Sequence, residues 1–145
     1  MMKKTLILLI IVICFNLVGC WPVDDMKQGY NQSVNFAKEF CVTLMNDDME
    51  LAKSYLHPSS APNQDRFESF VANLERTNDI EFASGFEIKN TIFKQLSYYD
   101  ASYGGSYYRF QFELLINSKT LNLYFVIVDN DIGYGIFYFG IIWFF

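Results

Sequence analysis

The spacing of apolar residues changes once along this chain, near Gly85. Before Gly85 they recur every three or four positions, as on the buried face of a helix. After it they alternate with polar residues, which is the pattern of a strand with one buried face. Helices first and strands afterwards predict an α+β fold, with the helices packed on one face of an antiparallel sheet.

Three helices are expected before Gly85, over residues 32–46, 48–56 and 64–75. The first has one apolar stripe, formed by Val34, Ala37, Cys41, Leu44 and Met45. Asp47 and Glu50 match a capping box at the start of the second helix. Pro58 ends that helix. The third helix repeats the stripe with Phe67, Phe70, Val71 and Leu74.

Four strands are expected after Gly85, over residues 86–98, 106–117, 120–128 and 132–145. On the first strand, one face is expected to carry Phe86, Ile88, Ile92, Leu96 and Tyr98. The loops between strands are short enough for hairpins, so the strands should form an antiparallel meander. Glycines inside the last strand permit it to bend. The sequence therefore predicts three N-terminal helices on a curved four-stranded antiparallel sheet.

The last ten residues, 136–145, are apolar on both faces of the expected strand and rich in aromatic side chains. A run of this length is too short for a membrane-spanning helix. We interpret it as a central or doubly covered strand. A strand edge that faces a partner or a membrane stays open as the alternative.

The N-terminus has the composition of a secretory signal. Lys3 and Lys4 precede an uncharged segment, residues 5–19, which is apolar apart from Asn16. A basic start, an apolar middle and a small residue before a cleavage point are typical of signal peptides. The small residue here is Gly19, and the residue that follows it is Cys20.

The four residues Leu17-Val18-Gly19-Cys20 resemble the lipobox of bacterial lipoproteins. The resemblance implies cleavage between Gly19 and Cys20, and a mature protein that is held to the membrane by acyl chains on Cys20. Trp21 stands where inner-membrane lipoproteins tend to have Asp, so the resemblance favours the periplasmic face of the outer membrane where a second membrane exists. Ordinary secretion with cleavage near Gly19 and an uncleaved anchor helix are the alternatives.

The expected organisation is a signal peptide over residues 1–19, a lipidated cysteine with a polar tether over 20–32, and one α+β domain over 33–145. The whole chain has a net charge of −5, and loss of Lys3 and Lys4 makes the mature part more acidic. Strong acidity argues against nucleic acid as a partner. Once Cys20 is acylated, Cys41 has no partner for a disulfide within the mature chain.

The order of three helices and long strands with interior glycines resembles the cystatin-like group, which includes the nuclear transport factor two-like domains. The stretch from Phe36 through Pro58 also resembles the opening of small envelope lipoproteins of that type. The resemblance implies a curved sheet around a long helix, with a cone-shaped cavity. Some members, such as ketosteroid isomerase and scytalone dehydratase, use carboxylates, histidines and tyrosines in that cavity for proton transfer. A cavity enzyme of this kind is therefore the alternative function.

The residues favour a binding or structural role over catalysis. Most carboxylates fall at helix starts or in turns, where solvated groups are expected, and the sequence 129–131 is interpreted as a turn rather than a calcium loop. His57, the only histidine, is expected to be structural, and Cys41 to be core packing. Lys94 and Arg109 are interpreted as solvated. No catalytic residue, metal ligand or cofactor site is predicted.

The segment from Tyr98 to Tyr108 is the best candidate for contact with a partner. Tyrosines surround a loop of small residues there, a composition that binding surfaces favour. The candidate partner-binding residues are Tyr99, Tyr103, Tyr107 and Tyr108. The alternative is a hairpin whose aromatic side chains pair across strands. The predicted function is a lipid-anchored envelope protein with a non-catalytic binding or structural domain, for which a protective or inhibitory role through protein or ligand binding would fit.

Overall fold

The computed structural model describes residues 21–62 and 64–142, and it has an α+β fold. The helices are α2 (Trp21–Met45), α3 (Met49–Ser54) and α4 (Phe67–Asn78), with short 3-10 turns η1 (Gln64–Arg66) and η2 (Phe82–Ser84). The strands are β1 (Glu87–Asp100), β2 (Gly105–Ile116), β3 (Lys119–Asn130) and β4 (Gly133–Ile142). The predicted lipobox and residues 143–145 lie outside the described residues.

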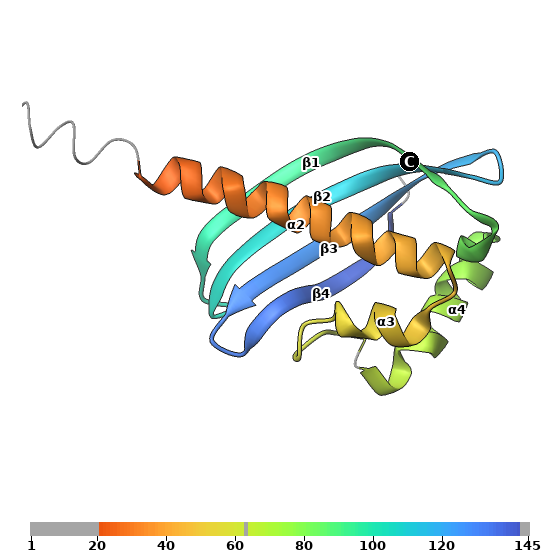
Figure 1. Cartoon of the computed structure of the whole chain (residues 1–145), viewed down its shortest axis with the longest axis horizontal. Coiled ribbons are helices and arrows are strands. Elements are labelled where there is room, and N and C mark those ends of the chain that lie inside the picture. The colour runs from red at the N-terminus through yellow and green to blue at the C-terminus, as the bar shows by residue number, and fades with distance from the viewer. Residues whose placement is uncertain (1–20, 63, 143–145) are drawn as a thin grey trace, which may run out of the picture.

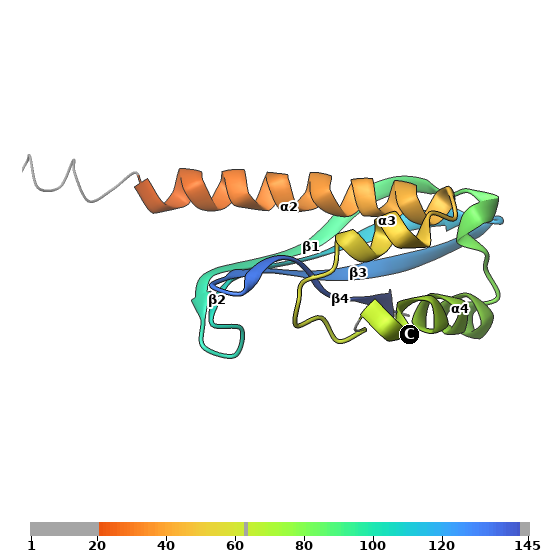
Figure 2. The ribbon, with the colours of Figure 1, turned by 60° about the horizontal axis from the view of Figure 1, so that its bottom comes forward.

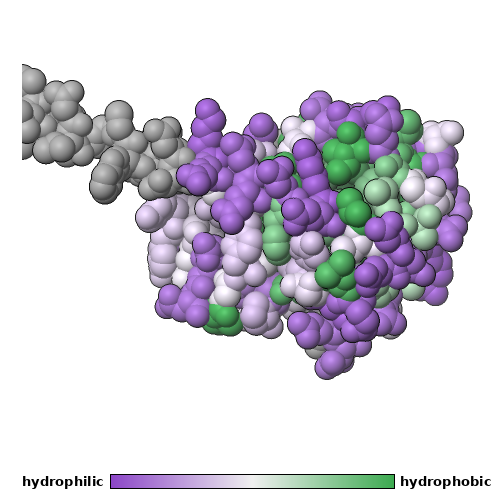
Figure 3. Space-filling model, viewed as in Figure 1, coloured by the Kyte–Doolittle hydropathy of each residue, from purple (hydrophilic) through white to green (hydrophobic). Residues whose placement is uncertain are grey.

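The strands form one antiparallel sheet in the order β1-β2-β3-β4. Helix α2 lies lengthwise over a face of this sheet, with α3 beside it (Figures 1 and 2). Helix α4 packs near the end of β4 (Figure 2). On the surface seen in Figure 3, hydrophilic side chains dominate and apolar patches interrupt them.

Residues 21–32, predicted to be a polar tether, instead form the first turns of α2. Pro22 is tolerated there because the first turn of a helix needs no hydrogen bond from its backbone nitrogen. Tyr30 is buried, and its ring meets that of Phe110 at 5.9 Å between centroids. The folded domain therefore begins earlier than residue 33.

Phenylalanines fill the space between the helices and the sheet. The fully buried members of this core include Phe40, Phe67, Phe82, Phe110, Phe112, Phe125 and Phe139. Phe40 of α2 lies at its centre, because its ring contacts Phe125 and Phe139 of the sheet and Phe67 of α4. Helices and strands thus share one core, as the apolar stripes predict.

Strand β1 departs from the predicted alternation. Its pairing with β2 shifts at three places, between Ile88 and Asn90, Ile92 and Lys94, and Ser97 and Asp100. Each shift adds a residue to β1 and reverses the faces of the residues that follow. Ile92, expected toward the core, consequently pairs with Gln111 on the opposite face. The prediction for Ile92 was wrong because a regular period of two was assumed.

Strand β4 is the last in the sheet order and is not a central strand. Its outer edge is nevertheless bonded by residues 55–61, which we call the strap. Leu56 and Ile136 form an isolated parallel bridge, in which Ile136 N donates to Tyr55 O at 2.8 Å and His57 N donates to Ile136 O at 2.9 Å. Ala61 N donates to Phe137 O at 3.0 Å. The strap is a contributor to the sheet that the sequence did not predict.

Candidate functional site

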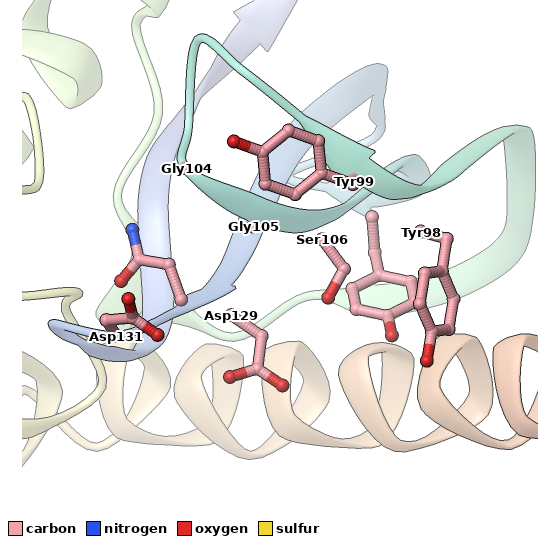
Figure 4. A pocket seen from close by; sticks show the side chains of 9 residues that line it. Tyr98, Tyr99, Gly104, Gly105, Ser106, Asp129 and Asp131 are labelled. Atoms are coloured by element: carbon pink, nitrogen blue, oxygen red, sulfur yellow. The ribbon is translucent and has the colours of Figure 1, made fainter.

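An open hollow of about 670 Å³ lies at the end of the sheet where the β1–β2 hairpin and the β3–β4 turn meet (Figure 4). It is lined by Tyr98, Tyr99, Gly104, Gly105, Ser106, Tyr108, Asp129, Asn130 and Asp131. Tyr98, Ser106 and Asp129 point toward α2, whereas Tyr99 points the other way, across the hairpin (Figure 4). The hollow therefore wraps around the end of the sheet.

Local sequence explains the hairpin that forms one wall. Asp100 Oδ1 accepts a hydrogen bond from Ser102 N at 2.8 Å, and Asp100 O accepts from Gly104 N at 2.9 Å. Gly104 has a φ of +67°, in the left-handed region that glycine occupies without strain. A Cβ atom on Gly105 would collide with the backbone oxygen of Asp129. These glycines permit the two turns to lie against each other.

Asn130 joins the two turns. Its Nδ2 donates to Tyr103 O at 2.7 Å, and its Oδ1 accepts from Ile132 N at 2.9 Å and from Gly133 N at 3.2 Å. Strand β3 continues through Asn130, so the turn consists of residues 131 and 132 and lies later than the predicted turn at 129–131. Asn130 supports the hollow from the end of the strand.

His57 attaches the strap to the same turn. It is buried, and its Nε2 lies 3.0 Å from Asn130 Oδ1 and 3.1 Å from Gly133 O. Its Nδ1 accepts a hydrogen bond from Ser59 N at 3.1 Å. Since Nδ1 is an acceptor, the neutral ring carries its proton on Nε2 and donates from there. These contacts give His57 a structural role.

Carboxylates make the hollow acidic. The side chains of Asp129 and Asp131 are exposed, and neither forms an ion pair with another described residue. Ion pairs lie elsewhere: Lys119 holds Asp79 at 2.6 Å and lowers the pKa of that carboxyl through a hydrogen bond. Lys53 Nζ donates hydrogen bonds to the carboxylates of Glu50 and Glu68, and these bonds raise the pKa of Lys53 to about 12. Within residues 21–62 and 64–142, the two carboxylates of the hollow thus have no lysine or arginine at ion-pair distance.

The structure divides the four predicted tyrosines between two places. Tyr99 and Tyr108 line the hollow, whereas Tyr107 is buried on the other face of the sheet together with Tyr103. Successive strand residues point to opposite faces, so a group of neighbours cannot form one surface. Tyr98 also lines the hollow; it begins the predicted segment 98–108 but was not among the four candidate residues, since its side chain was expected on the strand's apolar face.

Tyr103 and Tyr107 pack around Arg109 instead. The guanidinium carbon of Arg109 lies 4.6 Å from the centroid of the Tyr107 ring and 5.9 Å from that of Tyr103. Arg109 Nη2 also donates to the Tyr103 hydroxyl at 3.0 Å, and this hydrogen bond raises the pKa of Arg109. Arg109 is therefore part of a small aromatic cluster and not a solvated side chain. The alternative interpretation of the hairpin, cross-strand aromatic packing, applies to this pair of tyrosines.

Cys41 and Lys94 lie apart from the hollow. Cys41 is buried in α2, and burial raises the pKa of its thiol. Lys94 lies on the helix side of β1, with its ammonium 5.2 Å from the centroid of the Tyr30 ring. Within residues 21–62 and 64–142, no group of three or more histidine, cysteine or carboxylate side chains is placed to hold a metal ion.

Comparison of the chain with family models, with curated proteins and with solved structures finds no match. Among the described residues, no helix combines the length and apolar character needed to cross a membrane. The geometry of the hollow and the N-terminal sequence are therefore the basis for any functional conclusion.

Proposed function

We propose that this protein is a lipid-anchored component of the bacterial cell envelope, and that its domain binds a partner through a cationic group in the hollow. The anchor is supported by Leu17-Val18-Gly19-Cys20 and the basic and apolar segment before it. Acylation with two or more chains gives stable membrane attachment. Trp21 after the cysteine favours the periplasmic face of the outer membrane.

One observation carries the binding proposal: two carboxylates without ion-pair partners and two exposed tyrosines line the same hollow. Asp129 and Asp131 attract a positive charge, and the ring face of Tyr98, which points toward α2 as Asp129 does (Figure 4), attracts it as well through its quadrupole. Tyrosine also offers contact area at a low entropic cost. An ammonium or guanidinium group can both pair with a carboxylate and lie against a tyrosine ring.

The interior supports binding over the alternative of a cavity enzyme. An isomerase or dehydratase needs carboxylates or histidines that face the space between helix and sheet. The described core side chains in that space are mainly aromatic and aliphatic. The hydroxyls of Ser33 and Tyr134 lie 3.0 Å apart and hydrogen-bond to each other. We keep the cystatin-like cone as part of the proposal, because α2 lies lengthwise along one face of the antiparallel sheet (Figures 1 and 2).

A lysine peptide tests the binding site. The full chain in an uncharged detergent should bind tetralysine, with weaker binding at higher salt, and should not bind tetraglutamate. The double variant Asp129→Asn and Asp131→Asn should weaken binding by up to about thirtyfold, since each of the two exposed charge pairs contributes at most about 1 kcal/mol. Isothermal titration calorimetry measures the affinity for each peptide and the loss of affinity in the double variant.

Asp65→Asn is the matched control, because Asp65 is exposed in η1 and does not line the hollow. It removes one charge from the same acidic chain. Equal weakening in this control and in each single hollow variant would assign the effect to net charge and would overturn the proposed site.

A further inference from the structure

We propose that the hairpin end of the sheet rests on the bilayer, where the hollow receives the ammonium of a zwitterionic phospholipid headgroup. This inference rests on the proposed function, because it needs the lipid anchor at Cys20. It adds the orientation of the domain and the chemical class of the cation.

The first argument is that the start of α2 and the hairpins lie at the same end of the molecule. Helix α2 and strand β2 both start at the end of the molecule that carries the hollow (Figure 1). Gly29 of α2 lies against the hydroxyl of Tyr108 in β2, and a Cβ on Gly29 would collide with it. Eight helical residues separate Trp21 from Gly29, about 12 Å. Three strand residues separate Gly105 from Tyr108, about 10 Å. The start of α2 and the hairpins therefore lie at the same end of the molecule, where the first turn of α2 projects beyond the hairpins (Figures 1 and 2).

The second argument is the length of the connection. Cys20 directly precedes Trp21, the first residue of α2, so no spacer separates the acylated residue from the helix. A lipid on Cys20 would hold the first turn of α2 at the membrane surface. The hairpin end, on the same side of the molecule, would then face the headgroups.

The third argument is the distribution of exposed apolar side chains. Among the described large hydrophobic residues, the three most exposed are Tyr98 (69%), Tyr99 (66%) and Ile132 (62%). All three belong to the two turns at the hairpin end. Tyrosine is enriched at membrane interfaces, where its ring meets apolar material and its hydroxyl meets water. The exposed tyrosines thus suit this surface.

The carboxylates at the hairpin end favour zwitterionic headgroups over anionic ones. Asp129 and Asp131 repel an anionic membrane and attract the ammonium of phosphatidylethanolamine or phosphatidylcholine. Asp100, in the turn of the β1–β2 hairpin, adds a third carboxylate at this end. Tyrosine ring faces bind ammonium groups, including quaternary ones, by cation–π attraction. The hairpin end should therefore approach zwitterionic bilayers closely and stay farther from bilayers rich in phosphatidylglycerol.

Fluorescence quenching by a quencher dissolved in the lipid tests the orientation. The lipidated full chain is prepared as Ile132→Cys and, as a matched control, as Thr120→Cys, and each is labelled with the same fluorophore. Thr120 is exposed at the start of β3, at the opposite end of the sheet. Both sites are accessible, and Cys41 is buried. In vesicles of phosphatidylcholine and phosphatidylethanolamine, quenching should be several-fold stronger at position 132.

A second comparison tests the role of charge. Replacing phosphatidylethanolamine by phosphatidylglycerol should reduce quenching at position 132, and Asp129→Asn with Asp131→Asn should abolish this lipid preference. Equal quenching at positions 132 and 120 would overturn the inference, and so would stronger quenching in phosphatidylglycerol.

The two proposals can fail separately. Mass spectrometry of the N-terminal peptide and flotation with vesicles report the anchor, whatever the orientation of the domain. A floating, acylated protein with equal quenching at both positions would refute the orientation alone. A protein without acyl chains would refute the proposed anchoring and, with it, this inference.

Discussion

Asn130 shows how much a single side chain can organise. Its amide bonds to the hairpin before it, to its own turn and to His57 of the strap. The sequence predicts a turn at this position but not these partners, because residues 57 and 103 are far from it along the chain. Local composition indicates turns, whereas contacts between distant turns depend on the folded sheet.

The tyrosines show the same limit for candidate sites, because local composition does not show which face of the sheet each side chain occupies. Their concentration between residues 98 and 108 predicted a contact surface, and Tyr99 and Tyr108 do line the hollow. Tyr103 and Tyr107 could not be separated from them by composition. Strand alternation places Tyr107 on the opposite face, and Arg109 then holds both rings there.

Cys41 provides a prediction at this scale. Burial raises the pKa of its thiol above that of the unfolded chain, which is near 8.5. Above that pH the unfolded chain loses the thiol proton and the folded chain keeps it. The free energy of unfolding should therefore fall as pH rises, by up to about 1.4 kcal/mol per unit. Urea unfolding between pH 7 and pH 9.5, followed by circular dichroism, measures this slope.

Cys41→Ala is the control for the thiol. It should be less stable at pH 7, because it leaves space in the core, but its stability should depend less on alkaline pH. An unchanged slope in Cys41→Ala would show that other groups produce the dependence.

At the scale of elements, periodicity predicted which segments are helices and strands, and it failed mainly at their boundaries. The capping residue of α3 is Asp48, whose Oδ1 accepts from Leu51 N at 3.0 Å, and not the predicted Asp47. Asp47 instead has a φ of +55° and ends the connection from α2. The three shifts in β1 were also missed, since extra residues in a strand follow from its pairing with β2.

The strap predicts an effect at Gly135. A Cβ there would lie 2.6 Å from His57 N and 2.9 Å from the carbonyl carbon of Leu56, both backbone atoms that cannot rotate away. We expect Gly135→Ala to lower the free energy of unfolding by about 1 to 3 kcal/mol, as overpacking does. Thermal or urea unfolding measures the loss.

Gly140→Ala is the comparison within the same strand. Its Cβ would first meet the hydroxyl of Tyr138, the movable end of a side chain, at 2.7 Å. The loss should therefore be smaller than at Gly135. A larger loss at Gly140 would contradict the view that the strap needs a glycine opposite it.

At the scale of the whole molecule, the sequence predicted the α+β class and the shared aromatic core. The hollow was beyond its reach, because residues from 98–108 and from 129–131 form it together. Hydropathy shows which faces are buried. It does not show where two turns leave space between them.

The anchor predicts where the whole molecule resides. Cys20→Ser removes the thiol that would be acylated, and with it about 0.8 kcal/mol for each methylene that the bilayer buries. We expect the variant to leave the membrane fraction or to accumulate as an uncleaved precursor. Fractionation with immunodetection and intact mass of the N-terminus distinguish these results.

Ser33→Ala is a control that keeps Cys20, and it should remain in the membrane fraction. If Cys20→Ser fractionated in the same way as this control and had the same processed mass, acyl anchoring would be refuted.

The irregular pairing of β1 has a consequence for crowding. Strand β1 is the free border of the sheet, whereas the strap closes the border at β4. Molecules that are held in the plane of a membrane collide often. A straight edge strand with free backbone groups would allow the sheets of neighbouring copies to pair edge to edge and form fibres. The three register shifts in β1 and the lysines at positions 89 and 94 make this strand a poor template for such pairing. The bends in β1 should thus keep neighbouring copies apart at high density.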